Sequence, residues 1–269
     1  MSDFLKTMAA SSAVRAASVP GAYSAGELDR PAYPIRFEGF GVIAEIKNRS
    51  PAEGDLSASA GNLARRAVAY AEGGASAISV LTEPDRFDGA LSHLETVVDA
   101  VADRGVPVMR KDFLVDPRQV LEAKAAGASG VLLIAAMLDV AQMKRMLDSA
   151  FEHGLFVLLE SFDDSDLEYT AHLLGDASYH QQAADNRFLV GINSRNLRSL
   201  AVDPTRLERF GPLLPAGAVA VAESGLQNAG DARQASGWGY RMALVGTALM
   251  RAEDPARLIA DMIAAGRGA

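Results

Sequence analysis

The stretch AEGGASAISVL, residues 71–81, ends a helical pattern, turns at glycine and then starts a strand. The stretch AKAAGASGVLLI, residues 123–134, repeats this order, and both contain Gly-Ala-Ser at the turn. Glycine is favoured just after a helix because it adopts positive φ at no steric cost, and runs of branched residues are typical of buried strands. The shared order predicts a repeated helix–strand unit.

The same alternation continues along the chain on both sides of these two stretches. Apolar runs without polar alternation, as in parallel strands covered on both faces, alternate with amphipathic helical runs. We predict helices near 60–73, 91–103, 117–126, 138–152, 164–174, 204–210, 228–235 and 254–265. We predict strands at 41–47, 76–82, 107–111, 129–135, 155–160, 188–193, 218–223 and 242–246.

Eight such units favour an α/β fold of the closed (β/α)₈ TIM barrel type, which typically takes about 250 residues. An open, doubly wound sheet is the alternative, although it usually has fewer strands. Because no Pro/Gly/Ser-rich linker divides the chain, we expect residues 41–269 to form one barrel that carries the active site. Residues 1–40 would be an N-terminal extension with a helix near 3–17 and a loop, and 174–186 a polar surface connection.

Composition excludes several classes of protein. The chain has 269 residues, a formal net charge of -8 and no cysteine, which argues against general nucleic-acid binding and excludes disulfides and thiolate metal sites. Its four histidines show no ligand spacing, and there is no dinucleotide-binding fingerprint, so we predict no metal and no cofactor. No apolar run approaches the roughly 20 residues that cross a bilayer. We therefore expect a cytoplasmic protein with no membrane or nucleic-acid partner.

Polar residues concentrate where the predicted strands end. The first strand, in GVIAEIKNRSPAEG (41–54), ends with Glu45 and Lys47 two residues apart, so both side chains point to the same face. In TIM barrels the active site lies at this end of the strands. The other polar strand ends are Arg110-Lys111-Asp112, Leu159-Glu160-Ser161, Asn193-Ser194-Arg195, Glu223-Ser224-Gly225 and Gly246-Thr247.

Each of these residues, taken alone, has a plain structural explanation. Glu45 and Lys47 could be a local ion pair, Asn193 could cap a turn, and Arg195 could bind a surface carboxylate. Together they place cations, carboxylates and small-residue loops at one rim, which suits an anionic substrate that needs proton transfers. The loops after the seventh and eighth strands are the usual phosphate site of this fold.

Several motifs, in this order, resemble the indole-3-glycerol phosphate synthase family over roughly residues 35–265. They are IAEIKNRSPAEG (43–54), TEPDRFDGALSHL (82–94), VPVMRKDFLVDPRQVLEAKAAGASGVLLI (106–134), VGINSRNL (190–197), VAESGL (221–226) and ALVGTALMRAEDP (243–255). The resemblance implies a carboxy-lyase of tryptophan biosynthesis on a (β/α)₈ barrel. It would convert 1-(2-carboxyphenylamino)-1-deoxyribulose 5-phosphate to indole-3-glycerol phosphate, with loss of carbon dioxide and water.

Matching positions imply roles for individual residues. Lys111 would be a general acid and Glu160 a catalytic carboxylate, with Glu45 and Lys47 as a second acid–base pair; which lysine serves which step stays open. Asn193 would hold the substrate and its intermediates, and Arg195 the anthranilate carboxylate. The remaining substrate-binding residues would be Ser50, Ser224, Gly225, Gly246 and Thr247 at the phosphate, and Phe87, Phe113, Leu132 and Pro51 around the aryl ring.

The sequence also departs from the family. Ser161-Phe162 follows Glu160, where the family usually has an aliphatic residue and then His or Asn, and the N-terminal segment lacks clear likeness to the family's leading helices. Two alternatives follow: a specialised paralogue for a substituted anthranilate-derived substrate, and a phosphate-binding barrel without this activity. Phosphoribosylanthranilate isomerase is excluded because it would need a cysteine. We expect a monomer or weak homodimer, with other tryptophan-pathway enzymes as candidate partners.

Overall fold

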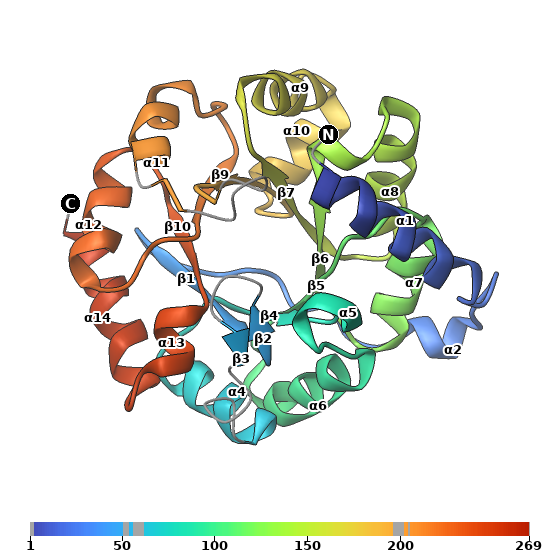
Figure 1. Ribbon diagram of the computed structural model, residues 1–269, viewed down its shortest axis with the longest axis horizontal. Coiled ribbons are helices and arrows are strands. Elements are labelled where there is room, and N and C mark those ends of the chain that lie inside the picture. The colour runs from blue at the N-terminus through green and yellow to red at the C-terminus, as the bar shows by residue number, and fades with distance from the viewer. Residues whose placement is uncertain (1–2, 51–53, 56–61, 196–201, 204, 269) are drawn as a thin grey trace.

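Eight parallel strands close into a barrel in the computed structural model, which describes residues 3–50, 54–55, 62–195, 202–203 and 205–268 (Figure 1). Each strand pairs with its neighbours in chain order, and the first strand pairs with both the second and the last. The predicted (β/α)₈ TIM barrel is therefore confirmed. Its strands are β1 (Gly41–Ile46), β4 (Ala77–Leu81), β5 (Val108–Lys111), β6 (Gly130–Ile134), β7 (Phe156–Ser161), β8 (Phe188–Asn193), β9 (Val219–Glu223) and β10 (Met242–Val245).

Helices surround the barrel, as the amphipathic runs predict (Figure 1). Most begin at an Asp or Asn whose side chain accepts a backbone N–H of the first turn, for example Asn62, Asp116, Asp139 and Asp163. The helices that follow the eight strands around the barrel are α4 (Leu63–Glu72), α6 (Leu91–Val101), α7 (Pro117–Ala125), α8 (Val140–Glu152), α9 (Asp164–Leu174), α11 (Thr205–Phe210), α12 (Ala229–Gly237) and α14 (Pro255–Arg267). No helix in the described ranges is both long and apolar enough to cross a membrane.

One connection contains a helix that was not predicted. The segment 174–186, predicted as a polar surface connection, lies between α9 and β8 and includes the helix α10 (Ala177–Ala184). Tyr179 and Ala183, four residues apart, are buried, while the other residues of this helix are exposed or half-buried. Tyr179 packs against Phe151 of α8 and Phe188 of β8. Two buried positions in eight give too weak a periodicity to predict a helix.

Short elements decorate the carboxyl end of the barrel. After β4 comes α5 (Pro84–Phe87), and after β10 comes α13 (Thr247–Arg251). A two-stranded antiparallel ladder, β2 (Arg49–Ser50) with β3 (Gly54–Asp55), follows β1. Three 3₁₀ turns, η1 (Ala102–Arg104), η2 (Ala135–Met137) and η3 (Gly211–Leu213), complete the connections in the described ranges. None of these short elements is apparent in the sequence periodicity.

The N-terminal segment is a helix that lies against the barrel. The predicted helix near 3–17 is confirmed as α1 (Asp3–Ala17), and a second short helix, α2 (Ala25–Leu28), follows it. Leu5, Met8, Ser12 and Ala16 of α1 are buried, at a spacing of three or four residues that forms one face. Figure 1 shows α1 in front of α7 and α8, on the side of the barrel that β5 and β6 form. This helix therefore borders the end of the barrel where the polar residues gather.

Candidate active site

A cavity of about 870 Å³ opens at the carboxyl ends of the barrel strands. All of the predicted site residues whose side chains the structure describes line it, although they come from all eight barrel strands and the loops that follow them. Pro51 and the side chain of Ser50 lie outside the described part of the chain. The predicted residues that line the cavity are Glu45, Lys47, Phe87, Lys111, Phe113, Leu132, Glu160, Asn193, Arg195, Ser224, Gly225, Gly246 and Thr247.

Glu45 and Lys47 form a nearly buried ion pair at the end of β1. The Nζ of Lys47 lies 2.8 Å from Oε1 of Glu45, and the Glu45 side chain is only 5% exposed. Burial alone would raise the pKa of Glu45, but Lys47 and Lys111 outweigh it and lower the pKa. A Cβ at Gly246 would overlap the Glu45 carboxylate and lie 2.8 Å from the Lys47 Nζ. Glycine at 246 therefore makes room for this pair.

Lys111, at the end of β5, is surrounded by carboxylates. Its Nζ donates to Oε2 of Glu160 at 3.1 Å and lies 3.7 Å from Oε2 of Glu223. Burial alone would lower the pKa of Lys111, but the neighbouring carboxylates, Glu160 first, outweigh it and raise the pKa. The ammonium group is thus held protonated at neutral pH, next to the open space of the cavity.

Asn193 and Arg195 continue the same set of contacts from the end of β8. The amide Nδ2 of Asn193 donates to Oε1 of Glu160 at 2.8 Å, and its Oδ1 accepts the backbone N–H of Arg195 at 2.8 Å. Because Asn193 is 7% exposed, this amide orients both the Glu160 carboxylate and the start of the next loop. Arg195 also lines the cavity.

Glu223 is a cavity residue that is absent from the predicted set. It ends β9, where its carboxylate is 1% exposed, and neither oxygen has a hydrogen-bond partner among the described residues. Burial and the nearby charge of Glu160 raise the pKa of Glu223 well above its ordinary value. A Cβ at Gly191 would overlap Glu223, so β8 leaves space for it. Glu223 stands at a polar strand end, and this position is the sequence signal that could have identified it as a site residue.

The loops after β9 and β10 form a small-residue side of the cavity. Ser224 and Gly225 have φ of 66° and 84°, and the left-handed conformation is unfavourable for a serine. The Ser194 hydroxyl donates to the Ser224 carbonyl at 2.9 Å and helps to hold this turn. Thr247 begins α13 directly after Gly246, so backbone N–H groups at the helix start are free of intrahelical partners. Such loops are suited to an anion.

Aromatic side chains form the other side. Phe87 and Phe113 lie 6.1 Å apart between ring centroids, and Phe4 of α1 meets Phe113 edge-on at 5.8 Å. Leu132 of β6 and Phe162, which follows β7, also line the cavity. Phe4 was not predicted, because its contact with Phe113 joins segments more than a hundred residues apart. This side is suited to a flat apolar ring.

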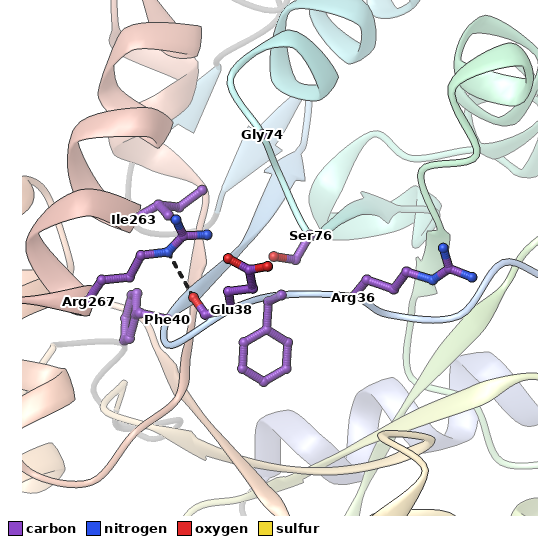
Figure 2. Close-up of a pocket in the computed structure, with 8 residues that line it drawn as sticks. Arg36, Glu38, Phe40, Gly74, Ser76, Ile263 and Arg267 are labelled. Carbon is purple, nitrogen blue, oxygen red and sulfur yellow. Dashed lines mark hydrogen bonds between the residues drawn. The ribbon is translucent and has the colours of Figure 1, made fainter.

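A second, smaller cavity of about 400 Å³ lies at the opposite end of the barrel. Figure 2 shows it between the start of β1, the turn before β4 and the last turn of α14. Its charged residues Arg36, Glu38 and Arg267 are exposed, and the Nε of Arg267 donates to the Glu38 carbonyl at 2.8 Å. In TIM barrels this amino end serves stability. Among the described residues, no group of three His, Asp or Glu side chains could hold a metal ion.

The main cavity can therefore move protons between two lysines and several carboxylates, with an anion held at one side and an aromatic ring at the other. Comparisons with known proteins agree with this arrangement. The family model for indole-3-glycerol phosphate synthase matches residues 35–262. An indole-3-glycerol phosphate synthase of a Nocardioides species is 43% identical over 232 residues, covering 85% of this chain and 83% of the relative. That of Mycolicibacterium smegmatis is 40% identical, covering 86% and 79%.

Solved structures support the fold alone, because their sequence identity is low. The 3-hexulose-6-phosphate synthase of Salmonella typhimurium superposes with a TM-score of 0.62 at 15% identity, covering 84% of this chain and 98% of that one. The thiamine phosphate pyrophosphorylase of Pyrococcus furiosus gives a TM-score of 0.55 at 16% identity, covering 86% and 96%. On the family model and the relatives of similar length, the chain belongs to the indole-3-glycerol phosphate synthase family.

Proposed function

We propose that this chain is an indole-3-glycerol phosphate synthase, a carboxy-lyase that closes the indole ring of 1-(2-carboxyphenylamino)-1-deoxyribulose 5-phosphate. One observation carries the proposal: Glu160 contacts both Lys111 and Asn193 inside a cavity that the Glu45–Lys47 pair also lines. Two acid–base sets facing one space suit a reaction with two proton-dependent stages, ring closure and loss of water.

The two sides of the cavity orient the substrate in this proposal. The phosphate would bind the loops at Ser224–Gly225 and Gly246–Thr247, with Ser50 as a further ligand. The aryl ring would stack between Phe87, Phe113, Leu132 and Pro51. The guanidinium of Arg195 would take the ring carboxylate, because its planar fork matches a carboxylate. Both charged ends of the substrate are then fixed while its ketone lies between the two lysines.

Lys111 is assigned to ring closure. The ring carbon that bears the carboxylate attacks the ketone carbon, and the ketone oxygen takes a proton from the Lys111 ammonium. Carbon dioxide then leaves, and the electrons of its bond restore the aromatic ring. The raised pKa of Lys111 ensures that the ammonium is present to stabilise charge on that oxygen. Glu160 holds the ammonium in place through its contact of 3.1 Å, and Asn193 orients that carboxylate through a hydrogen bond of 2.8 Å.

The Glu45–Lys47 pair is assigned to dehydration. The hydroxyl formed in the first stage leaves as water with a proton from Lys47, while a carboxylate takes a proton from the neighbouring methylene carbon. The lowered pKa of Glu45 keeps it ionised and able to accept that proton. Because both acid–base sets line one cavity, the substrate can react with each in turn without being released.

A second candidate function keeps the reaction and changes the substrate. Phe162 is 8% exposed and lines the aryl side of the cavity, at a position where the sequence departs from the family. A bulky ring there would alter the space for substituents on the anthranilate ring. Under this alternative, a substituted anthranilate-derived substrate would give a higher kcat/KM than the unsubstituted one, and the ratio would fall in Phe162→Leu.

The decisive experiment follows the indole fluorescence of the product with purified protein and the carboxyphenylamino substrate. We expect turnover by the wild type and loss of roughly 10²–10⁴-fold in kcat for Lys111→Ala and Glu160→Gln. Lys144→Ala, an exposed lysine on α8, is the matched control and should behave as the wild type. Circular dichroism checks that all variants fold. Tight substrate binding by an inactive wild type would instead favour a binding barrel without this activity.

The same proposal extends to organisation and surroundings. Residues 41–269 would form the catalytic domain and residues 1–40 its extension, in a cytoplasmic protein that is a monomer or weak homodimer. Sedimentation at two protein concentrations tests the oligomeric state. Complexes with other tryptophan-pathway enzymes would appear as a shift in sedimentation when those enzymes are added.

A further inference from the structure

The last turn of α1 is joined to the residue that follows Lys111. The guanidinium of Arg15 donates two hydrogen bonds to the carboxylate of Asp112, Nη1 to Oδ2 and Nη2 to Oδ1, each at 2.8 Å. The Asp112 side chain is completely buried, and that of Arg15 is 24% exposed. Two parallel bonds between a guanidinium and a carboxylate fix orientation as well as distance. The N-terminal helix is thus held to the end of β5.

Asp112 is the centre of a larger buried network. Its carboxylate also accepts from the Thr82 hydroxyl at 2.8 Å, the Phe113 backbone N–H at 2.8 Å and the Arg110 guanidinium at 3.3 Å. Burial alone would raise the pKa of Asp112, but Arg15 and Arg110 outweigh it and lower the pKa. Asp112 therefore stays charged, and every contact that it makes restricts the backbone beside Lys111.

The other end of α1 also reaches the cavity. Phe4 lines it and packs edge-on against Phe113, which follows Asp112 in the chain. Between the two ends, the Ser12 hydroxyl accepts from the side chain of Gln119 on α7 at 3.0 Å. The helix is therefore fixed at three points along the side of the cavity that β5 forms, and two of those points adjoin Lys111.

We propose that Arg15 is a positioning residue for the reaction, acting through Asp112 on Lys111. Arg15 touches neither the cavity nor Lys111, but without its fork Asp112 loses two of its charge-assisted hydrogen bonds and the segment after β5 is less restrained. The Lys111 Nζ is set between Glu160 at 3.1 Å and Glu223 at 3.7 Å, so a shift of the backbone moves the acid relative to the ketone. Misplacement of a catalytic group by about 1 Å can cost roughly 10²-fold in rate. The inference depends on the proposed function for its kinetic part.

The kinetic test compares Arg15→Met and Arg15→Lys with Arg118→Met. Arg118 forms a similar fork with Asp116, at 2.9 Å for both bonds, but both side chains are more exposed, at 37% and 30%, and the fork is not bonded to Asp112. We expect kcat to fall roughly 10–100-fold in Arg15→Met with less than threefold change in KM, a smaller loss in Arg15→Lys, and wild-type values in Arg118→Met. Methylguanidinium added to Arg15→Ala should restore part of kcat. Equal kcat in Arg15→Met and wild type would overturn the positioning role while leaving the proposed function intact.

A measurement without substrate tests the same inference if the wild type is inactive. Amide hydrogen exchange across residues 110–114 should be faster in Arg15→Met than in wild type, and unchanged in Arg118→Met. The rest of the barrel should exchange at the wild-type rate, which separates a local effect from general loss of stability. Unchanged exchange at 110–114, or faster exchange everywhere, would overturn the proposal.

Discussion

The two ends of the barrel both carry a cavity with charged side chains, but the charges are held in different ways. At the carboxyl end, the side chains of Glu45, Glu160 and Glu223 are each 5% exposed or less and lie next to lysines from other positions. At the amino end, Arg36 and Glu38, which Figure 2 draws around the smaller cavity, are exposed. The charged groups at the carboxyl end contact protein groups instead of water, whereas those at the amino end stay in contact with water.

This difference indicates where the fold gives up stability for chemistry. Removing a charged group from water costs several kcal/mol, and even a well-paired buried ion pair often adds nothing to stability. A barrel that only needed to fold could fill the carboxyl end with apolar residues. Buried, mutually perturbed acids and bases are instead typical of catalytic sites. The amino end has no such group in its cavity, within the described residues.

The largest difference in kcat/KM between the two ends should appear when one cation is removed from each. Lys47→Ala leaves the buried Glu45 without its 2.8 Å partner, so we expect kcat/KM to fall roughly 10²–10⁴-fold. Arg267→Ala removes a cation of similar length at the amino end and should leave kcat/KM within twofold. Steady-state kinetics on both variants makes the comparison. A comparable loss in Arg267→Ala would mean that the amino end takes part in catalysis.

A second pair of variants sharpens the contrast through glycine. In Gly246→Ala the new methyl group would displace Glu45 and Lys47, and we expect activity to fall roughly tenfold to a hundredfold with a small change in stability. In Gly266→Ala, on α14, the methyl group would meet the buried ring of Phe40, with its Cβ at 2.8 Å. Overpacking of this kind costs about 1–3 kcal/mol in the free energy of unfolding.

Urea unfolding and activity per folded molecule separate these two outcomes. Gly246→Ala should keep its unfolding midpoint and lose turnover, and Gly266→Ala should do the reverse. If both variants lost stability and activity in parallel, the two ends would not differ in the way that their buried charges indicate.

The sequence predicts the barrel well because the strands are buried on both faces and read as apolar runs. Their boundaries then locate Glu45, Lys111, Glu160 and Asn193 at one rim without any contact being known. Residues whose role depends on tertiary contact are harder. The contacts Phe4–Phe113 and Arg15–Asp112 join segments that are far apart in the chain, and nothing local in α1 marks them.

Glu223 was missed for a different reason. It stands at a strand end, but the following Ser224-Gly225 was interpreted as a phosphate-binding loop. Glu223 itself was given no role. The register of the sheet pairs Asn193 with Glu223, so the two share a level in the barrel. The helix α10 was missed because only Tyr179 and Ala183 are buried. In both cases the prediction depends on the burial of individual side chains, which sequence periodicity does not reveal.

A smaller effect should appear in the dependence of stability on pH. Burial raises the pKa of Asp166 on α9 to about 6, even though its carboxylate accepts the Phe162 backbone N–H at 2.9 Å. The folded protein therefore binds this proton more tightly than the unfolded chain, whose aspartate has a pKa near 3.8. The free energy of unfolding should fall as pH rises from about 4 through about 6, because the folded state must then lose the proton.

Asp166→Asn tests that sign and keeps an acceptor for the Phe162 N–H. The variant should gain stability relative to wild type at pH 6.5 compared with pH 4.5, as measured by urea unfolding at both values. Effects of pH on all other groups are common to the two proteins and cancel in the difference. A gap between variant and wild type that is the same at both pH values would contradict the raised pKa.

The smallest effect should come from Arg36→Ala at the amino end. Within the part of the chain that the structure describes, Arg36 is exposed and makes no hydrogen bond or ion pair, although it lines the smaller cavity. A surface substitution of this kind usually changes the free energy of unfolding by less than about 0.5 kcal/mol. Urea unfolding and kcat/KM should therefore match the wild type. A large change in either quantity would show that an exposed charge at the amino end also contributes to stability or activity. Burial would then distinguish the two ends, but function would not.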